Sequence, residues 1–203
     1  MAGNREFLNR RLHSLLGVVP IGIFLIVHLV VNHFATGGEE SFNNAVGFME
    51  SLPFLIFLEI IVIYLPLLFH AIYGLYIAFT AKNNTSKLGY FRNWMFLFQR
   101  ISGVIVLIFL AWHVYETRIQ AALGNAELNF NLMEDVFSNP WMIGFYIVGL
   151  IATTFHFSNG LWSFCVSWGI TQSPRSQQIA SYVVLVVFVV LSIIGIRAIF
   201  AFV

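Results

Sequence analysis

Charge and cysteine are both scarce in this 203-residue chain, and each shortage excludes a class of protein. Only 9% of the residues are charged and the formal net charge is +1. Without a basic run, the composition argues against a nucleic-acid partner. The one cysteine, Cys165, cannot form an internal disulfide, and the chain has no C-x-x-C-H sequence for covalent haem attachment.

Apolar sequence is what the chain has in abundance. Hydrophobic residues make up 59% of it, and its mean hydropathy is +0.85. These values indicate an integral membrane protein rather than a globular domain around a core. Five apolar stretches reach the roughly 20 residues that a membrane helix needs. We therefore predict an all-α fold, a single transmembrane domain over residues 1–203. Its five helices are expected at about 14–34, 54–80, 97–117, 141–168 and 179–202.

The first stretch is predicted to be a retained helix. Its apolar part is longer than that of a secretory signal, and no A-x-A cleavage site follows it. In the second stretch Pro66 predicts a kink, because proline removes a backbone donor.

The loops differ in charge, and this difference predicts the orientation. Lysine and arginine collect in short cytoplasmic connections. The N-terminal segment and the loops after the second and fourth spans are basic, whereas the loops after the first and third spans are acidic. We expect a multi-pass protein of the cell membrane with its N-terminus in the cytoplasm and its C-terminus outside. The basic residues are Arg5, Arg10, Arg11, Lys82, Lys87, Arg92 and Arg175; the acidic ones are Glu39, Glu40, Glu50, Glu127, Glu134 and Asp135.

Four histidines lie away from the ends of the spans, one in each of the first four. At a rise of 1.5 Å per residue, His28 and His113 fall roughly 5 to 9 Å outward of their helix midpoints. By the same rise, His70 and His156 fall roughly 2 to 5 Å inward of theirs. Two layers result, each with two histidines on non-adjacent spans.

The histidine-bearing faces also carry small or polar residues at the other layer. Positions 11 apart on a helix fall nearly on one line, about 16 Å apart along the axis. This is what two stacked planar cofactors in a four-helix bundle require, because each helix ligates one and must let the other pass near its backbone. The residues at the other layer are Gly17, Glu59 and Ser102, eleven before His28, His70 and His113, and Gly149, seven before His156. Gly74 and Gly160, four after the inner histidines, are expected beside the inner ligands, where a Cβ would hold the porphyrin edge away.

The chemistry of these histidines favours haem. A neutral imidazole offers a lone pair to a metal, and two rings on one haem iron leave no open position, which suits electron transfer rather than oxygen activation. The alternative is a set of core histidines hydrogen-bonded across helices. Four histidines in two matched layers favour ligation. His33 lies about 140° round the helix from His28 and is assigned to the outer interface, and His13 to an interfacial or subunit contact.

Four stretches of the sequence together carry a resemblance to a known family: HSLLGVVPIGIFLIVHLVVN, LPLLFHAIYGLYIAFTAKN, RNWMFLFQRISGVIVLIFLAWHVYETR and FHFSNGLWSFCVSWGITQSPRSQ. They resemble the two-haem cytochrome b subunit of succinate dehydrogenase, of the Gram-positive bacterial type linked to menaquinone. The resemblance extends over nearly the whole chain. It implies a five-helix membrane anchor with two b haems, bound to a flavoprotein and an iron–sulfur subunit on the cytoplasmic side. It also implies electron transfer from succinate to menaquinone.

In that family the outer haem is held by the histidines that match His28 and His113. The inner haem, which has the higher potential, is held by those that match His70 and His156. The pairing agrees with the one obtained from depth, and the ligand positions show no departure from the family pattern.

Two further residues are candidates for roles beside the haems. Arg100, at the start of the third span, is placed to bind a propionate of the inner haem, with Ser102 and Ser14 as weaker candidates. Its alternative role is to extend its charge to the interface, and the resemblance favours the propionate. A carboxylate in a span is costly, so Glu59 is a candidate proton donor to menaquinone, unless its helix starts late enough to leave it among the headgroups.

Other functions remain compatible with the residues alone. One is a different two-haem cytochrome, such as the anchor of a hydrogenase or formate dehydrogenase, or an ascorbate-driven cytochrome b. Another is a haem-free transporter that uses its histidines as a proton relay. A quinone site near the inner haem, close to Trp162, Trp168 and Arg100, also stays open.

Overall fold

The computed structural model describes residues 2–82 and 84–203. Across these two ranges the secondary structure is helical, with no strand. Five of the helical segments are long and apolar enough to cross a membrane, which confirms the predicted all-α bundle of five spans. The segments are Asn4–Gly37, Leu55–Thr80, Phe91–Ala122, Pro140–Ser167 and Pro174–Phe200.

The first span is two helices in succession, α1 (Ala2–Val18) and α2 (Pro20–His33), followed by a 3₁₀ turn. The break falls at Pro20, which has no N–H to donate. Helix α1 begins well before the predicted start at residue 14, because hydropathy detects only the part of a helix suited to hydrocarbon. Its polar beginning is stabilised by the pair between Glu6 and Arg10 at 2.8 Å.

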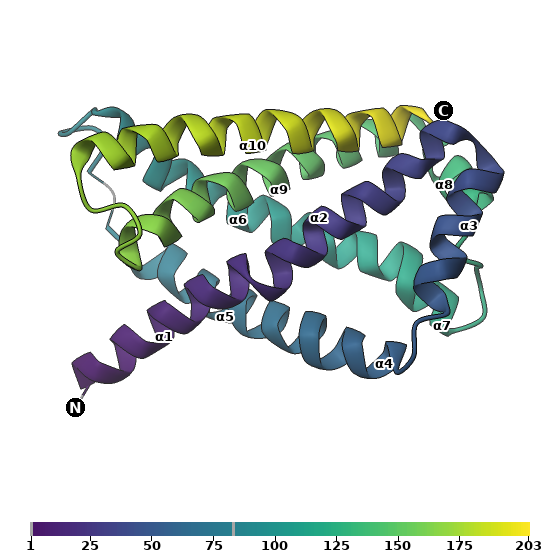
Figure 1. Cartoon of the computed structure of the whole chain (residues 1–203), viewed down its shortest axis with the longest axis horizontal. Helices are drawn as coiled ribbons and strands as arrows, with labels where there is room; N and C mark the ends of the chain where they lie inside the picture. The colour runs from purple at the N-terminus through teal and green to yellow at the C-terminus, as the bar shows by residue number, and fades with distance from the viewer. Residues whose placement is uncertain (1, 83) are drawn as a thin grey trace.

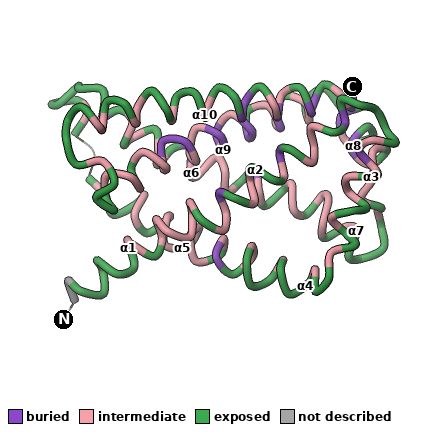
Figure 2. Tube along the Cα trace, in the orientation of Figure 1, coloured by how far each residue is buried: buried purple, intermediate pink, exposed green. Residues whose placement is uncertain are grey.

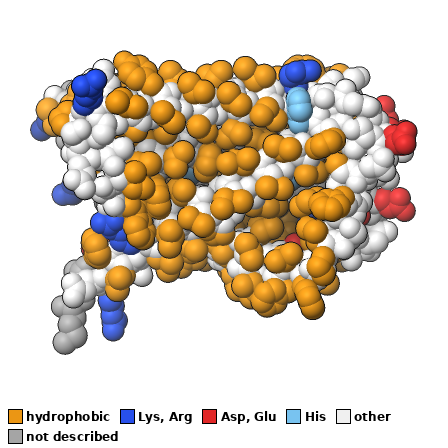
Figure 3. Space-filling model, in the orientation of Figure 1, with side chains coloured by type: hydrophobic (Ala, Val, Ile, Leu, Met, Phe, Trp, Pro, Cys, Tyr) orange, Lys and Arg blue, Asp and Glu red, His pale blue; other side chains and the backbone are white. Residues whose placement is uncertain are grey.

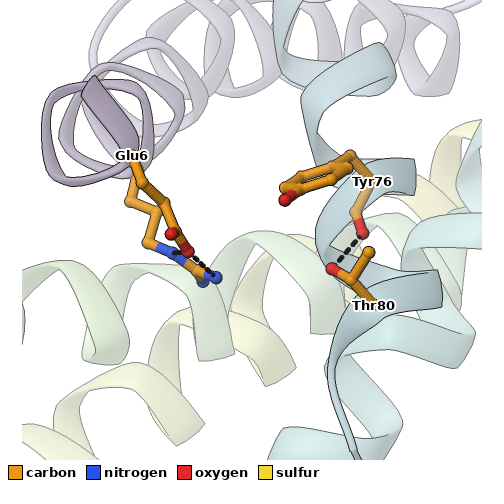
Figure 4. A network of polar contacts seen from close by, with 4 residues as sticks. Glu6, Tyr76 and Thr80 are labelled. Atoms are coloured by element: carbon orange, nitrogen blue, oxygen red, sulfur yellow. Dashed lines mark hydrogen bonds and ion pairs between the residues drawn. The ribbon is translucent and has the colours of Figure 1, made fainter. Parts of the chain in front are cut away.

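Figure 4 shows this part of α1 opposite α5 (Leu65–Thr80), whose Thr80 hydroxyl donates to the Tyr76 carbonyl at 2.6 Å. In the figure the Tyr76 ring extends into the space between the two helices. The helical N-terminal segment therefore continues the first span beyond its apolar part, alongside the second.

The second and third spans both contain wide, π-helical turns toward one end. The second is α4 (Leu55–Phe57), the π-helical segment η2 (Leu58–Tyr64) and then α5. Pro66 lies in the first turn of α5, where its missing N–H is tolerated, and the wide turns precede it. The third span is α6 (Phe91–Val114), the π-helical η3 (Tyr115–Ile119) and α7 (Gln120–Ala122).

The fourth span, α9 (Pro140–Ser167), lies at the centre of the bundle. It packs against α6 and against the fifth span, α10 (Pro174–Phe200); α10 in turn covers α2, and α1 packs on α5 (Figure 1). Figure 2 shows buried residues where α9 and α10 meet. There the Thr154 and Ser192 hydroxyls are 2.8 Å apart, and a Cβ added at Gly195 would lie 2.6 Å from Leu150. The fifth span is thus a packing helix without a histidine.

Two short helices cap the end of the bundle that carries the acidic loops. These are α3 (Glu39–Glu50) and α8 (Phe130–Phe137), which the hydropathy pattern did not predict. They enclose a small aromatic core with the chain end, in which Phe42 and Phe202 meet edge to face at 5.0 Å. We call this the outer end, and the opposite one, with the N-terminus, the inner end.

Charge separates along the long axis of the molecule. In Figure 3 most lysine and arginine side chains lie at the inner end and acidic ones gather at the outer end, with a broad apolar belt between them. The two chain termini lie at opposite ends (Figure 1), as an odd number of spans requires. The bundle therefore has the asymmetry from which the orientation was predicted.

Candidate haem-binding site

Two pairs of histidines meet inside the bundle, and they are the pairs predicted from depth. The rings of His28 on α2 and His113 on α6 have centroids 5.7 Å apart. Those of His70 on α5 and His156 on α9 are 6.1 Å apart. Imidazole nitrogens bind transition metals at about 2 Å, so two rings on opposite sides of one metal have centroids about 6 Å apart. Both spacings fit one metal between each pair.

At the inner pair, backbone carbonyls orient the rings. The Nδ1 atom of His70 is 2.9 Å from the carbonyl oxygen of His13, and Nδ1 of His156 is 3.1 Å from that of Gln99. A carbonyl can only accept, so each Nδ1 carries the proton and donates it. The Nε2 lone pairs are then free for a metal, which is the usual arrangement of ligating histidines.

At the outer pair, side chains take this role. Nδ1 of His113 lies 3.2 Å from the Tyr146 hydroxyl, which itself donates to the Glu116 carboxylate at 2.8 Å. His28 differs from the other three, because its Nε2 lies 3.4 Å from the amide nitrogen of Asn32. That amide also donates to the His28 carbonyl at 2.8 Å, a stronger contact.

The donor set suits a metal that brings most of its own ligands. Within residues 2–82 and 84–203, no group of three or more His, Cys, Asp or Glu side chains is gathered as a bare ion would need. Haem iron takes four nitrogens from its ring and needs only axial ligands from the protein. Two histidines per layer therefore fit haem.

The residues expected opposite each layer lie close to it. A Cβ added at Gly17 would be 2.4 Å from Cε1 of His70, and the Ser102 hydroxyl is 3.3 Å from Nδ1 of His156. A Cβ added at Gly149 would lie 2.3 Å from the Phe109 ring, and that ring stacks on the ring of His113. Gly17 and Ser102 thus lie at the inner layer and Gly149 beside the outer one, as the helical register predicts.

The two glycines expected beside the inner ligands have other neighbours. An added Cβ at Gly74 would lie 3.4 Å from Nε2 of His13, and one at Gly160 would lie 3.3 Å from the Gln99 amide. Room for a porphyrin edge at these two positions stays a prediction.

Arg100 has donors to spare. Its Nη1 donates to the Ala81 carbonyl at 2.7 Å, and its guanidinium lies 4.7 Å from the centre of the Phe96 ring. Its Nε and Nη2 atoms are buried and find no partner in the part of the chain that the structure describes. A buried guanidinium with two unused N–H groups is suited to an anion with two oxygens, such as a carboxylate.

Glu59 forms an ion pair that the sequence did not predict. Its carboxylate lies 2.9 Å from Nη2 of Arg118 on η3. The prediction that Glu59 shares a helix face with His70, eleven residues later, assumed α-helical turns and does not hold here. The turns of η2 between them are wider and alter the direction of the Glu59 side chain. Arg118 also lines an open, mostly apolar recess of about 870 Å³, formed with Glu50, residues 54–57, Ile60 and Ile61. We call this the outer recess.

A smaller cavity of about 100 Å³ lies near the inner end, lined among others by Arg92, Gln99 and Trp162. The Arg92 guanidinium lies 3.6 Å from the centre of the Trp162 ring and fills much of the approach to it. The larger of these two spaces is thus at the outer end.

Comparison with known proteins identifies the family of this chain. Residues 82–195, more than half of the chain, match the family described as succinate dehydrogenase/fumarate reductase transmembrane subunit. The chain is also 64% identical to the succinate dehydrogenase cytochrome b558 subunit of Bacillus subtilis (strain 168), over 203 residues and 100% of both chains. The chain belongs to this family. The resemblance noted in the sequence is thereby confirmed.

In this member of the succinate dehydrogenase/fumarate reductase family, sequence reasoning missed residues that touch the histidines. The His13 ring meets that of His70 at 4.0 Å, although His13 was assigned to an interface. Its position four residues before Gly17 was an available signal, since both lie on one helical face. Gly103, where an added Cβ would lie 3.0 Å from Cε1 of His156, and Tyr146 gave no comparable signal. His33 lies as expected away from the pairs, 3.4 Å from the Ile194 carbonyl.

Proposed function

We propose that this chain is the cytochrome b membrane anchor of a succinate dehydrogenase, binding two b haems and carrying electrons from the iron–sulfur subunit to menaquinone. One observation carries the proposal. Two histidine pairs lie at bis-ligand spacing, 5.7 and 6.1 Å between ring centroids, on four helices of a chain from this family. The outer haem is assigned to His28 and His113, and the inner haem to His70 and His156.

The chain's own residues bind and orient the two groups. The Nε2 atoms of the histidines would bind the haem irons, and the carbonyls of His13 and Gln99 hold the inner rings in place. The free N–H groups of Arg100 are assigned to a propionate of the inner haem. A bound bis-histidine haem supplies one-electron transfer without an open coordination position.

The soluble subunits are assigned to the inner end. Its basic loops favour a cytoplasmic position for this end, so the flavoprotein and the iron–sulfur subunit would dock there, nearest His70 and His156. The C-terminus then lies outside. Succinate chemistry belongs to the flavoprotein, and this chain contributes the path across the membrane.

Menaquinone reduction is assigned to the outer recess. Its wall is apolar and suits a naphthoquinone ring, while Arg118 brings the Glu59 carboxylate to its border. Glu59 is the proposed proton donor to the quinone. Proton uptake there takes place from the outer side.

The test is purification in mild detergent followed by haem analysis and subunit identification. We expect two b haems per chain, with bis-histidine spectra, and co-purification of a succinate-oxidising flavoprotein. The same haems with a hydrogenase or formate dehydrogenase partner would replace this function with that of another respiratory anchor. A chain without haem would point to a proton-coupled transporter.

A further inference from the structure

Three side chains from three elements form a hydrogen-bonded chain at the outer end. His113 of α6 lies 3.2 Å from the hydroxyl of Tyr146 on α9, and that hydroxyl lies 2.8 Å from the carboxylate of Glu116 on η3. The Tyr146 side chain is only 4% exposed. Neither Tyr146 nor Glu116 has a part in the function proposed above.

The chemistry fixes the direction of this chain. A carboxylate can only accept, so the Tyr146 hydroxyl donates to Glu116 and its oxygen lone pair faces His113. The Nδ1 atom of His113 is then the donor. The ring of Tyr146 cannot turn away, because Phe109 and Phe137 meet it edge to face at 5.3 and 4.9 Å. The hydroxyl is therefore held between the imidazole and the carboxylate.

Among the residues that the structure describes, the inner pair has no such connection to a carboxylate. Its Nδ1 atoms donate to the backbone carbonyls of His13 and Gln99, which carry no net charge. An acceptor that is polarised by a carboxylate draws the Nδ1 proton more strongly and makes the opposite nitrogen a better electron donor. Stronger donation stabilises ferric over ferrous iron, and so lowers the reduction potential.

We propose that Tyr146 and Glu116 are positioning residues that lower the reduction potential of the outer haem relative to the inner one. The inference rests on the proposed ligation by His28 and His113. Both residues act through the His113 ring.

The experiment is a potentiometric titration of the purified complex carrying Tyr146→Phe or Glu116→Gln. Tyr146→Phe keeps the packing of the ring but removes the acceptor, so the midpoint potential of the outer haem should rise. Glu116→Gln keeps an acceptor for the hydroxyl and removes the charge, so the rise should be smaller. The inner haem should keep its potential in both. Tyr115→Phe, one residue from Glu116 but with its ring tilted against that of Trp112, is the matched control and should change the potential of neither haem.

The outcomes separate this inference from the function on which it rests. Two haems with unchanged potentials in Tyr146→Phe would overturn the inference and leave the ligation intact. Equal shifts of both haems would overturn it too, since they would indicate a general effect on the bundle. If Tyr146→Phe does not assemble, the Glu116→Gln titration decides alone. A wild-type complex without two bis-histidine haems would instead contradict the proposed function.

Discussion

The inner and outer ends of the bundle hold their histidines by different means. At the inner end, His70 and His156 donate to carbonyls of neighbouring helices, and Gly17 brings a backbone directly against a ring. At the outer end, side chains support His113, and the second and third spans widen into π-helical turns. The inner geometry therefore depends on helix packing, whereas the outer geometry depends on individual side chains that substitution can change one at a time.

The largest expected effect comes from removing one ligand. His156→Ala should eliminate the inner haem while the outer one stays, and His113→Ala should do the reverse. The chain should still insert, because insertion depends on hydropathy. Reduced-minus-oxidised spectra of membranes measure this directly. Loss of both haems in each variant would mean that the two layers are not independent, and retention of both would refute the assignment of ligands.

A strong effect is also expected at the outer end alone. Glu59→Gln keeps the shape of the side chain but removes its proton, so quinone reduction should slow by about 10-fold or more while both haems stay bound. Succinate:menaquinone activity and haem spectra would be measured together. Glu40→Gln, an exposed acid of the same end, is the control. Normal turnover in Glu59→Gln would remove that residue from the mechanism.

The membrane potential should distinguish the two ends as sites of quinone reduction. With the inner end assigned to the cytoplasm, an electron that passes to the outer end moves away from the negative side of the membrane, which lowers its free energy. One charge across 100 mV is worth about 2.3 kcal/mol. An uncoupler should therefore slow succinate-to-menaquinone activity several-fold in sealed, energised membranes. Succinate oxidation by an artificial acceptor should persist. An unaffected menaquinone rate would place the quinone at the inner end, near Trp162.

The smallest effect is expected from Gly17→Ala. The new Cβ would lie 2.4 Å from the His70 ring, which must shift, and such overpacking costs about 1–3 kcal/mol. The inner haem should show an altered spectrum or partial loss, and the outer haem should not change. Gly47→Ala, where an added Cβ meets nothing within 4 Å, is the control. Equal disturbance of both haems would show that the layers are mechanically coupled.

The sequence predicted the spans and the pairing of the histidines because both follow from distance along the axis. Hydropathy located the five spans, and the rise per residue placed His28 with His113 and His70 with His156. It placed the start of the first helix too late, since a helix can leave the apolar region and continue, as α1 does from Ala2.

Contacts between helices were harder to predict. Which side chains meet depends on how each helix is rotated, and this information is not in the hydropathy of one chain. The pair of Glu59 with Arg118 was missed because the wide turns of η2 change that rotation. The approach of Tyr146 to His113 was missed because a buried tyrosine in an apolar helix resembles an ordinary packing residue.

The order of the four histidines along the chain has a topological consequence. His28 pairs with His113, and His70 pairs with His156, so the two pairs alternate in the sequence. A group bound between each pair would close two loops of about 85 residues that overlap by half, and closing such long loops restricts the unfolded chain. Each loop contains one anchor point of the other. The two bound groups would thus act as interlocked staples, so that no one of the first four spans could leave the bundle without opening one of them.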